Sequence, residues 1–100
     1  MLRHIVMWRF KDEAEGRTKQ QNMEYIASKL LSLKGVIPEI KNIEIGMNIN
    51  KGAAAYDMAL ITEFENEAAL EAYQTHPKHV EVSEYVSKVR TDRAVADYMF

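Results

Sequence analysis

Residues 3–10 read RHIVMWRF, and this stretch decides the fold. Its β-branched and aromatic residues are typical of a β-strand. Apolar side chains fall on both alternating sets, because Ile5 and Met7 point one way while Val6 and Trp8 point the other. A strand with apolar residues on both faces lies inside a sheet that is covered on each side. We therefore predict that residues 3–10 form a central strand.

A helix is expected to follow this strand. Residues 11–16 are polar and end in a glycine, so we expect a loop there. Thr18 is followed three residues later by a glutamine, a pattern that resembles a capping box. Apolar residues then recur at helical spacing until Gly35, which is expected to end the helix in the left-handed conformation, and Pro38 prevents the helix from resuming. The sequence thus predicts one amphipathic helix over residues 18–34.

The rest of the chain predicts three more strands and a second, interrupted helix. Alternating apolar residues indicate strands at residues 39–49, 56–64 and about 93–99. Asn66 is a good N-cap for a helix that runs to Tyr73, and Pro77 interrupts it. Since proline suits a first helical position, we expect a new helical segment to begin near His76.

The predicted order is strand, helix, strand, strand, helix, strand, which is the ferredoxin-like βαββαβ arrangement of the α+β class. Both helices must then pack on one face of a four-stranded antiparallel sheet. The other face is apolar and would be bare in a monomer, and an exposed apolar face of that size marks an interface. We therefore expect a homodimer in which two sheets face each other as a dimeric α+β barrel.

Composition narrows the class of protein. The chain has 100 residues, which indicates one domain over residues 1–100. It has no cysteine, which excludes disulfides and thiolate metal sites, and its formal net charge is −2. The basic residues are scattered and the middle of the chain is acidic, so we expect no nucleic-acid partner. No apolar run is long enough to span a bilayer, and the N-terminus lacks the apolar core of a signal peptide. We expect a cytoplasmic protein without a membrane partner.

The candidate chemical site surrounds the second helical break. Tyr73, His76 and His79 fall within seven residues of one another, and His79 shares an apolar helix face with Val82. A half-buried imidazole titrates near neutral pH, as a general acid or base must. The Tyr73 hydroxyl is suited to polarise or hold a carbonyl group, and His4 on the first strand is expected to reach the same cavity. The alternative is that His79 and Tyr73 only pack in the core.

Two other interpretations of the polar residues remain open. His76 and His79, with His4, have the residue types of a zinc site, although Pro77 favours an outward-pointing His76. A further set of charged residues is expected to form inter-subunit or sheet-edge ion pairs: Glu39, Glu44, Arg9, Arg93 and Asp97. There is no glycine-rich phosphate loop, and we assign no cofactor and no metal.

These residues also carry a family resemblance that covers essentially the whole chain. The matching segments are RHIVMWRFK at the start, GVIP after the first helix, ALEAY in the second helix, HPKH at residues 76–79, and ADY near the end. In this order and spacing the chain resembles the stress-responsive α/β-barrel family, whose members are called Dabb domains. The resemblance implies a dimeric ferredoxin-like α+β barrel, and most members have no assigned activity.

The resemblance also implies site residues. In one plant member, olivetolic acid cyclase, which closes a linear polyketide by aldol chemistry, the general acid–base histidine matches His79, a cavity tyrosine matches Tyr73, and a cavity histidine matches His4. This sequence departs at Met58, where that enzyme has another cavity histidine, and at Arg93, which replaces an apolar cavity residue. Another plant member binds magnesium through backbone carbonyls, and the matching stretch here is Leu31, Lys34 and Ile37.

Three hypotheses about function follow. In the first, a small carbonyl or phenolic compound binds at a site inside each barrel, Tyr73 orients it, and His79 exchanges a proton with it while His4 assists. In the second, the protein is a non-catalytic, stress-associated accessory dimer whose interior is filled by large side chains: Met7, Trp8, Met47, Met58 and Phe64. The third, by analogy of fold, is a cofactor-free monooxygenase.

Overall fold

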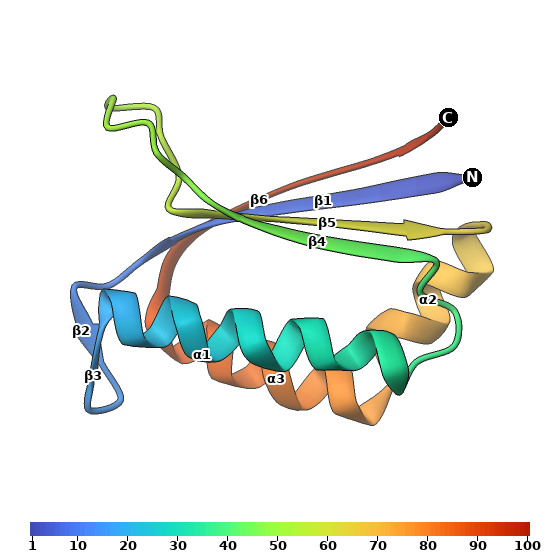
Figure 1. Cartoon of the computed structure of the whole chain (residues 1–100), viewed down its shortest axis with the longest axis horizontal. Helices are drawn as coiled ribbons and strands as arrows, with labels where there is room; N and C mark the ends of the chain where they lie inside the picture. Colours follow the sequence, from blue (N-terminus) through green and yellow to red (C-terminus); the bar gives the residue numbers. More distant parts are fainter.

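A computed structural model describes residues 1–100 as four strands, three α-helices and a small hairpin. The strands β1 (Leu2–Phe10), β4 (Asn42–Met47), β5 (Met58–Phe64) and β6 (Arg90–Met99) form an antiparallel sheet in the order β4-β5-β1-β6. The helices α1 (Lys19–Ser32), α2 (Glu67–Thr75) and α3 (Pro77–Val89) lie against one face of this sheet (Figure 1). The predicted ferredoxin-like α+β order and the central position of the first strand are confirmed.

The two faces of the sheet have different environments. Residues directly opposite each other on neighbouring strands point to the same face, so the strand register fixes both sets. On β1 the even-numbered residues, such as Val6 and Trp8, are buried beneath the helices, whereas Ile5 and Met7 point to the other face and are partly exposed. Further apolar residues share that open face, as partners of Ile5 and Met7 in the ladders: Ala59, Ile61, Ala94 and Ala96.

The core lies between the helices and the sheet. It contains 18 buried apolar residues, to which α1 contributes Ile26 and Leu30 and α3 contributes Val82, Val86 and Val89. The large side chains expected to fill one interior are divided between the core and the exposed surface. Trp8, Met58 and Phe64 belong to this core, whereas Met7 and Met47 are exposed.

The helix ends follow the sequence signals. Thr18 and Gln21 form the predicted capping box, and the Asn66 side chain accepts a hydrogen bond of 2.9 Å from the backbone N–H of Ala69. Pro77 occupies the first turn of α3, where its missing N–H is not needed. The interrupted second helix is therefore confirmed as two separate helices.

The end of α1 differs from the prediction. Gly35 has no positive φ, and the helix instead tightens into the 3-10 turn Leu33–Gly35 (η1). This turn carries the chain back under the sheet, because the Ile37 N–H bonds the Leu33 carbonyl at 2.8 Å and Ile37 itself is fully buried. The first strand after the helix is shorter than predicted (42–47 rather than 39–49), since Ile40 belongs to the core connection instead.

The expected loop at residues 11–16 contains a short hairpin. Its strands are β2 (Glu13–Ala14) and β3 (Arg17–Thr18), and the turn between them holds the two positive-φ residues, Glu15 at 53° and Gly16 at 74°. Two successive left-handed residues fit a tight hairpin turn, in which a glycine is favoured. The last strand also starts three residues earlier than predicted, at Arg90.

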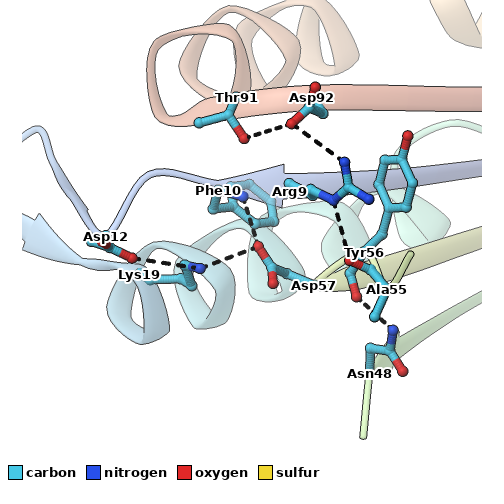
Figure 2. A network of polar contacts seen from close by, with 10 residues as sticks. All are labelled: Arg9, Phe10, Asp12, Lys19, Asn48, Ala55, Tyr56, Asp57, Thr91 and Asp92. Carbon is cyan, nitrogen blue, oxygen red and sulfur yellow. Dashed lines mark hydrogen bonds and ion pairs between the residues drawn. The ribbon is translucent and has the colours of Figure 1, made fainter. Parts of the chain in front are cut away.

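A polar network fastens the long connection between β4 and β5 to the end of β1 (Figure 2). Asp57 accepts a 2.8 Å hydrogen bond from the Phe10 backbone N–H and lies 3.5 Å from the Lys19 ammonium. Arg9 donates to the Ala55 carbonyl at 3.2 Å and lies 3.8 Å from the Asp92 carboxylate. Arg9 thus pairs within its own chain, as one of the charged residues expected to form sheet-edge ion pairs.

Candidate functional site

The break between α2 and α3 brings Tyr73 and His79 together. Tyr73 lies near the end of α2 and His79 lies in the first turn of α3. Because the chain changes direction at His76, the two rings face each other with centroids 4.3 Å apart. Phe64 packs on the Tyr73 ring as well, at 5.0 Å between centroids. The break between the two helices therefore brings together a tyrosine and a histidine that are six residues apart in the sequence.

Tyr73 is fully buried, and its hydroxyl has no hydrogen-bond partner in the chain. Burial raises the pKa of this phenol far above its ordinary value, and the positive charge of Arg93 opposes the rise only in part. The hydroxyl therefore keeps its proton at neutral pH. Burying an O–H without a hydrogen-bond partner costs free energy, and this hydroxyl is free to donate a hydrogen bond to an acceptor.

His79 is half-buried and is held in one orientation. Its Nδ1 lies 3.2 Å from the Gln74 carbonyl oxygen, which can only accept, so Nδ1 carries a proton and donates. Burial lowers the pKa of this imidazole below its ordinary value of 6.5, while the bond to Gln74 opposes that shift. At neutral pH the ring is therefore mainly neutral, and its Nε2 presents a lone pair. This is the protonation state of a general base.

His4 is the third predicted site residue, and the structure adds a partner to it. Its ring lies edge-on to Tyr73 with centroids 6.4 Å apart, and only 2% of the residue is exposed. Its Nδ1 pairs with the Asp97 carboxylate, which faces it across the β1–β6 ladder. The sequence predicted Asp97 only in inter-subunit or sheet-edge ion pairs. Its contact with His4 depends on the register between β1 and β6, which no local signal in the sequence reveals.

These side chains border one cavity of about 270 Å³. It lies between α3 and the strands β1 and β6, and His4, Tyr73 and His79 all line it. Its other lining residues form an apolar wall and a polar rim: Val6, Trp8, Leu30, Leu60, Val82, Val86, Gln74, Ser83, Ser87, Arg90 and Arg93. The cavity is slightly smaller than the ~300–1,000 Å³ of sites for drug-sized ligands, so it suits a small metabolite.

The cavity lies on the helix-covered side of the sheet, where His79 was expected to point inward from its helix and His4 to reach the same cavity from the sheet. The apolar residues of the open face, such as Ile5 and Ile61, do not line it. The cavity is therefore formed within a single chain. Arg93 borders the cavity, as the resemblance implied, whereas the buried Met58 does not.

His76 is not brought into this site. Its Nδ1 accepts a 3.1 Å hydrogen bond from the Lys78 backbone N–H, so it serves as the cap of α3. No group of three His, Cys, Asp or Glu residues converges on a point where they would hold a metal ion. In the stretch compared with a magnesium site, the Ile37 carbonyl accepts the Ile40 N–H at 3.2 Å. None of the helices combines the length and apolar character needed to cross a bilayer.

Comparisons with known proteins agree with this architecture. The model of the Stress responsive A/B Barrel Domain family, Dabb, matches residues 2–100. An uncharacterized protein of Streptomyces coelicolor is 29% identical over 79 residues, which is 79% of each chain. A dimeric ferredoxin-like protein of unknown function from Bacteroides fragilis is 29% identical with a TM-score of 0.81, covering 99% of this chain and 95% of its own.

Enzymes are among the proteins with a similar fold. A hydroxynitrile lyase from Passiflora edulis superimposes with a TM-score of 0.84 over 99% of this chain and 92% of its own, at 20% sequence identity. At that identity the likeness shows the fold alone.

Proposed function

Because the chain belongs to the stress-responsive A/B barrel (Dabb) domain family, we propose that it is a homodimeric protein that binds a small carbonyl compound in each protomer and catalyses proton transfer on it. Tyr73 and His79 are the groups that carry this chemistry, and His4 supports them. The proposal requires no cofactor to balance the step, since a proton is moved within one substrate.

The observation that carries the proposal is the pairing of an unpartnered hydroxyl with a neutral imidazole at one cavity. The Tyr73 O–H is buried without an acceptor, and the His79 ring lies 4.3 Å from the tyrosine ring. Burial pushes the pKa values of the two groups in opposite directions, upward for the tyrosine and downward for the histidine. One group is thereby kept as a donor and the other as a base, which is the division of roles that acid–base catalysis needs.

The step follows from these two states. The Tyr73 hydroxyl donates a hydrogen bond to the substrate carbonyl oxygen, which stabilises negative charge there. His79 Nε2 takes a proton from the carbon next to that carbonyl, and the electron pair of the broken C–H bond forms the enolate. The imidazolium then returns a proton to the same carbon, which restores the carbonyl compound and the neutral imidazole. Asp97 holds the His4 ring by its Nδ1, which leaves the Nε2 edge of the ring to contact the substrate.

Ligand binding must also uncover the tyrosine. The Tyr73 oxygen exposes less than 1 Å², so a carbonyl reaches it only after a neighbouring side chain moves.

Dimerisation is proposed on the open face of the sheet. Apolar residues such as Ile5, Met7 and Ile61 lie there without cover from the helices, and a large apolar face favours association. The similar structure from Bacteroides fragilis is described as dimeric. A single domain over residues 1–100 and a cytoplasmic location remain predictions.

The test is hydrogen–deuterium exchange on small ketones and phenolic acids, followed by proton NMR in D₂O. We expect the protein to accelerate exchange at the carbon next to the carbonyl, and His79→Gln to reduce that rate by about 10²–10⁴-fold, the usual contribution of a general base. The matched control is His76→Gln, which removes the imidazole outside the cavity. Equal rates for the protein and for both variants, with the dimer intact by sedimentation, would contradict the proposal.

One observation favours the alternative of a non-catalytic accessory dimer. If the Tyr73 oxygen stays covered, the cavity has no accessible donor and serves only as packing space. In that case none of the ketones or phenolic acids would shift the His79 resonances. The monooxygenase alternative has no comparable observation in its favour.

A further inference from the structure

Building on the proposed function, we propose that Arg93 makes this cavity selective for carbonyl compounds that carry a carboxylate. The substrate class would then be small keto acids and related carbonyl-bearing carboxylates, bound with the acid group at Arg93 and the carbonyl at Tyr73. Four features of the site support this inference.

The first feature is the placement of Arg93 by the strand register. Arg93 lies opposite Trp8 on the β1–β6 ladder, and Asp97 lies opposite His4. Both pairs point to the helix-covered face and both strands border the cavity. The two positions lie four residues apart, roughly 13 Å along β6. Arg93 therefore lies at one end of the cavity wall and His4 lies at the other end. This arrangement suits a ligand with two functional groups.

The second feature is the lack of a competing anion. Of the two carboxylates on β6, Asp97 pairs with His4, and Asp92 pairs with Arg9 at 3.8 Å. Arg93 forms no ion pair in the chain, and no Asp or Glu side chain lines the cavity. A second cation, Arg90, lines the same wall. The net positive lining and the free donors of a guanidinium favour an anionic ligand.

The third feature is electrostatic contact with the reacting groups. The charge of Arg93 lowers the pKa of Tyr73 and the pKa of His79, in each case as a smaller contribution beside burial. Its charge therefore reaches both side chains. An anion bound at Arg93 would sit within the same small cavity as the hydroxyl and the imidazole.

The fourth feature favours a carboxylate over a phosphate as the bound anion. Ser83 and Ser87 line the cavity from the second half of α3, which ends at Val89. The carbonyl end of a helix carries partial negative charge, so it opposes a dianion more strongly than a monoanion. The planar guanidinium fork also matches a carboxylate in two parallel hydrogen bonds. These terms favour a singly charged, planar acid group.

The probes for the test are 4-oxopentanoate and its neutral methyl ester, which share one ketone and differ in charge. Trp8 is the single tryptophan of the chain and it lines the cavity, so its fluorescence reports binding at this site. We expect the acid to bind at least about tenfold more tightly than the ester, because hydrogen bonds to charged groups are the stronger kind. Arg93→Gln should abolish that preference, and Arg93→Lys should keep part of it because the charge remains and the fork is lost.

The matched control is Arg9→Gln. It removes the same charge from the open face of the sheet, where Arg9 pairs with Asp92, and it should leave the preference for the acid unchanged. Arg93 is exposed, so its substitution should leave the fold intact, which circular dichroism checks. Equal affinities for acid and ester, or no fluorescence change with either probe, would overturn the inference.

The same probes distinguish this inference from the proposed function. Preferential binding of the acid that depends on Arg93, without deuterium exchange, would support the carboxylate site and contradict the catalytic proposal. Exchange at equal rates on the acid and the ester, unaffected by Arg93→Gln, would do the opposite.

Discussion

Replacing Tyr73 by phenylalanine should stabilise the protein while it impairs the proposed reaction. The substitution deletes one buried oxygen that has no hydrogen-bond partner and exposes less than 1 Å² to water. Leaving such a group unpaired costs about 1–3 kcal/mol. The phenyl ring keeps the aromatic contacts with Phe64 and His79, at 5.0 and 4.3 Å between centroids. We therefore expect Tyr73→Phe to raise the free energy of unfolding by about 1–2 kcal/mol.

The assay is thermal unfolding at one fixed protein concentration, because the Tm of a dimer depends on concentration. For a domain of this size each kcal/mol shifts Tm by roughly 4–8 °C. The same variant should lose most of the exchange activity, since the carbonyl then has no donor. Higher stability with lower activity is the expected pattern at a site that holds a polar group for its ligand.

Tyr85→Phe is the matched control. The Tyr85 hydroxyl is satisfied, since it donates to the Asn22 side chain and accepts a 2.6 Å hydrogen bond from Arg17. Asn22 is fully buried, so removing its partner should lower the unfolding free energy by about 1–3 kcal/mol. A Tm that falls equally in Tyr73→Phe and Tyr85→Phe would refute the reasoning, because both hydroxyls would then be contributing hydrogen bonds.

Three further predictions concern pH, assembly and the loop network. Because the pKa of His79 is lowered on folding, the unfolded chain binds more protons below pH 6.5 than the folded chain does. The unfolding free energy should therefore fall as the pH drops from about 6.5 through the folded pKa, and His79→Gln should flatten that dependence in urea titrations. Ile61→Lys on the open face should shift the protein to monomers in sedimentation at micromolar concentration, and an unchanged dimer would place the interface elsewhere. Asp57→Ala should lower Tm by removing the acceptor of the Phe10 N–H and the partner of Lys19, at a cost of about 1–3 kcal/mol; a Tm equal to that of the parent would mean that this network adds nothing.

Local signals in the sequence determined most of the fold. The alternation in residues 3–10 identified the central strand, and the Thr18 capping box, the Asn66 cap and Pro77 marked the starts of the three helices. Such signals act over a few residues and therefore can be detected in one dimension. Gly35 was misjudged, because the burial of Ile37 requires a tightened right-handed turn there. That requirement comes from the core and not from the glycine.

The candidate site was predicted only as a set of residues. Its members Tyr73 and His79 were recognised because they lie close in sequence around a helix break, where polar side chains often face a cavity. His4 was added from its strand and from the family resemblance. The sequence did not show that the Tyr73 hydroxyl is unpaired or which His79 nitrogen carries the proton. The first depends on burial and the second on the position of the Gln74 carbonyl, and both are set by the three-dimensional structure.

The sequence alone was enough to predict the order of strands and helices, the apolar character of both sheet faces and a set of candidate site residues, because each of these depends on residues that are neighbours along the chain. The tertiary structure was needed to show which partners meet at the cavity. His4 meets Asp97, and Arg93 faces the cavity without an acid, because of the register between β1 and β6. These strands are separated by most of the chain, and a shift of one residue would turn every side chain to the opposite face.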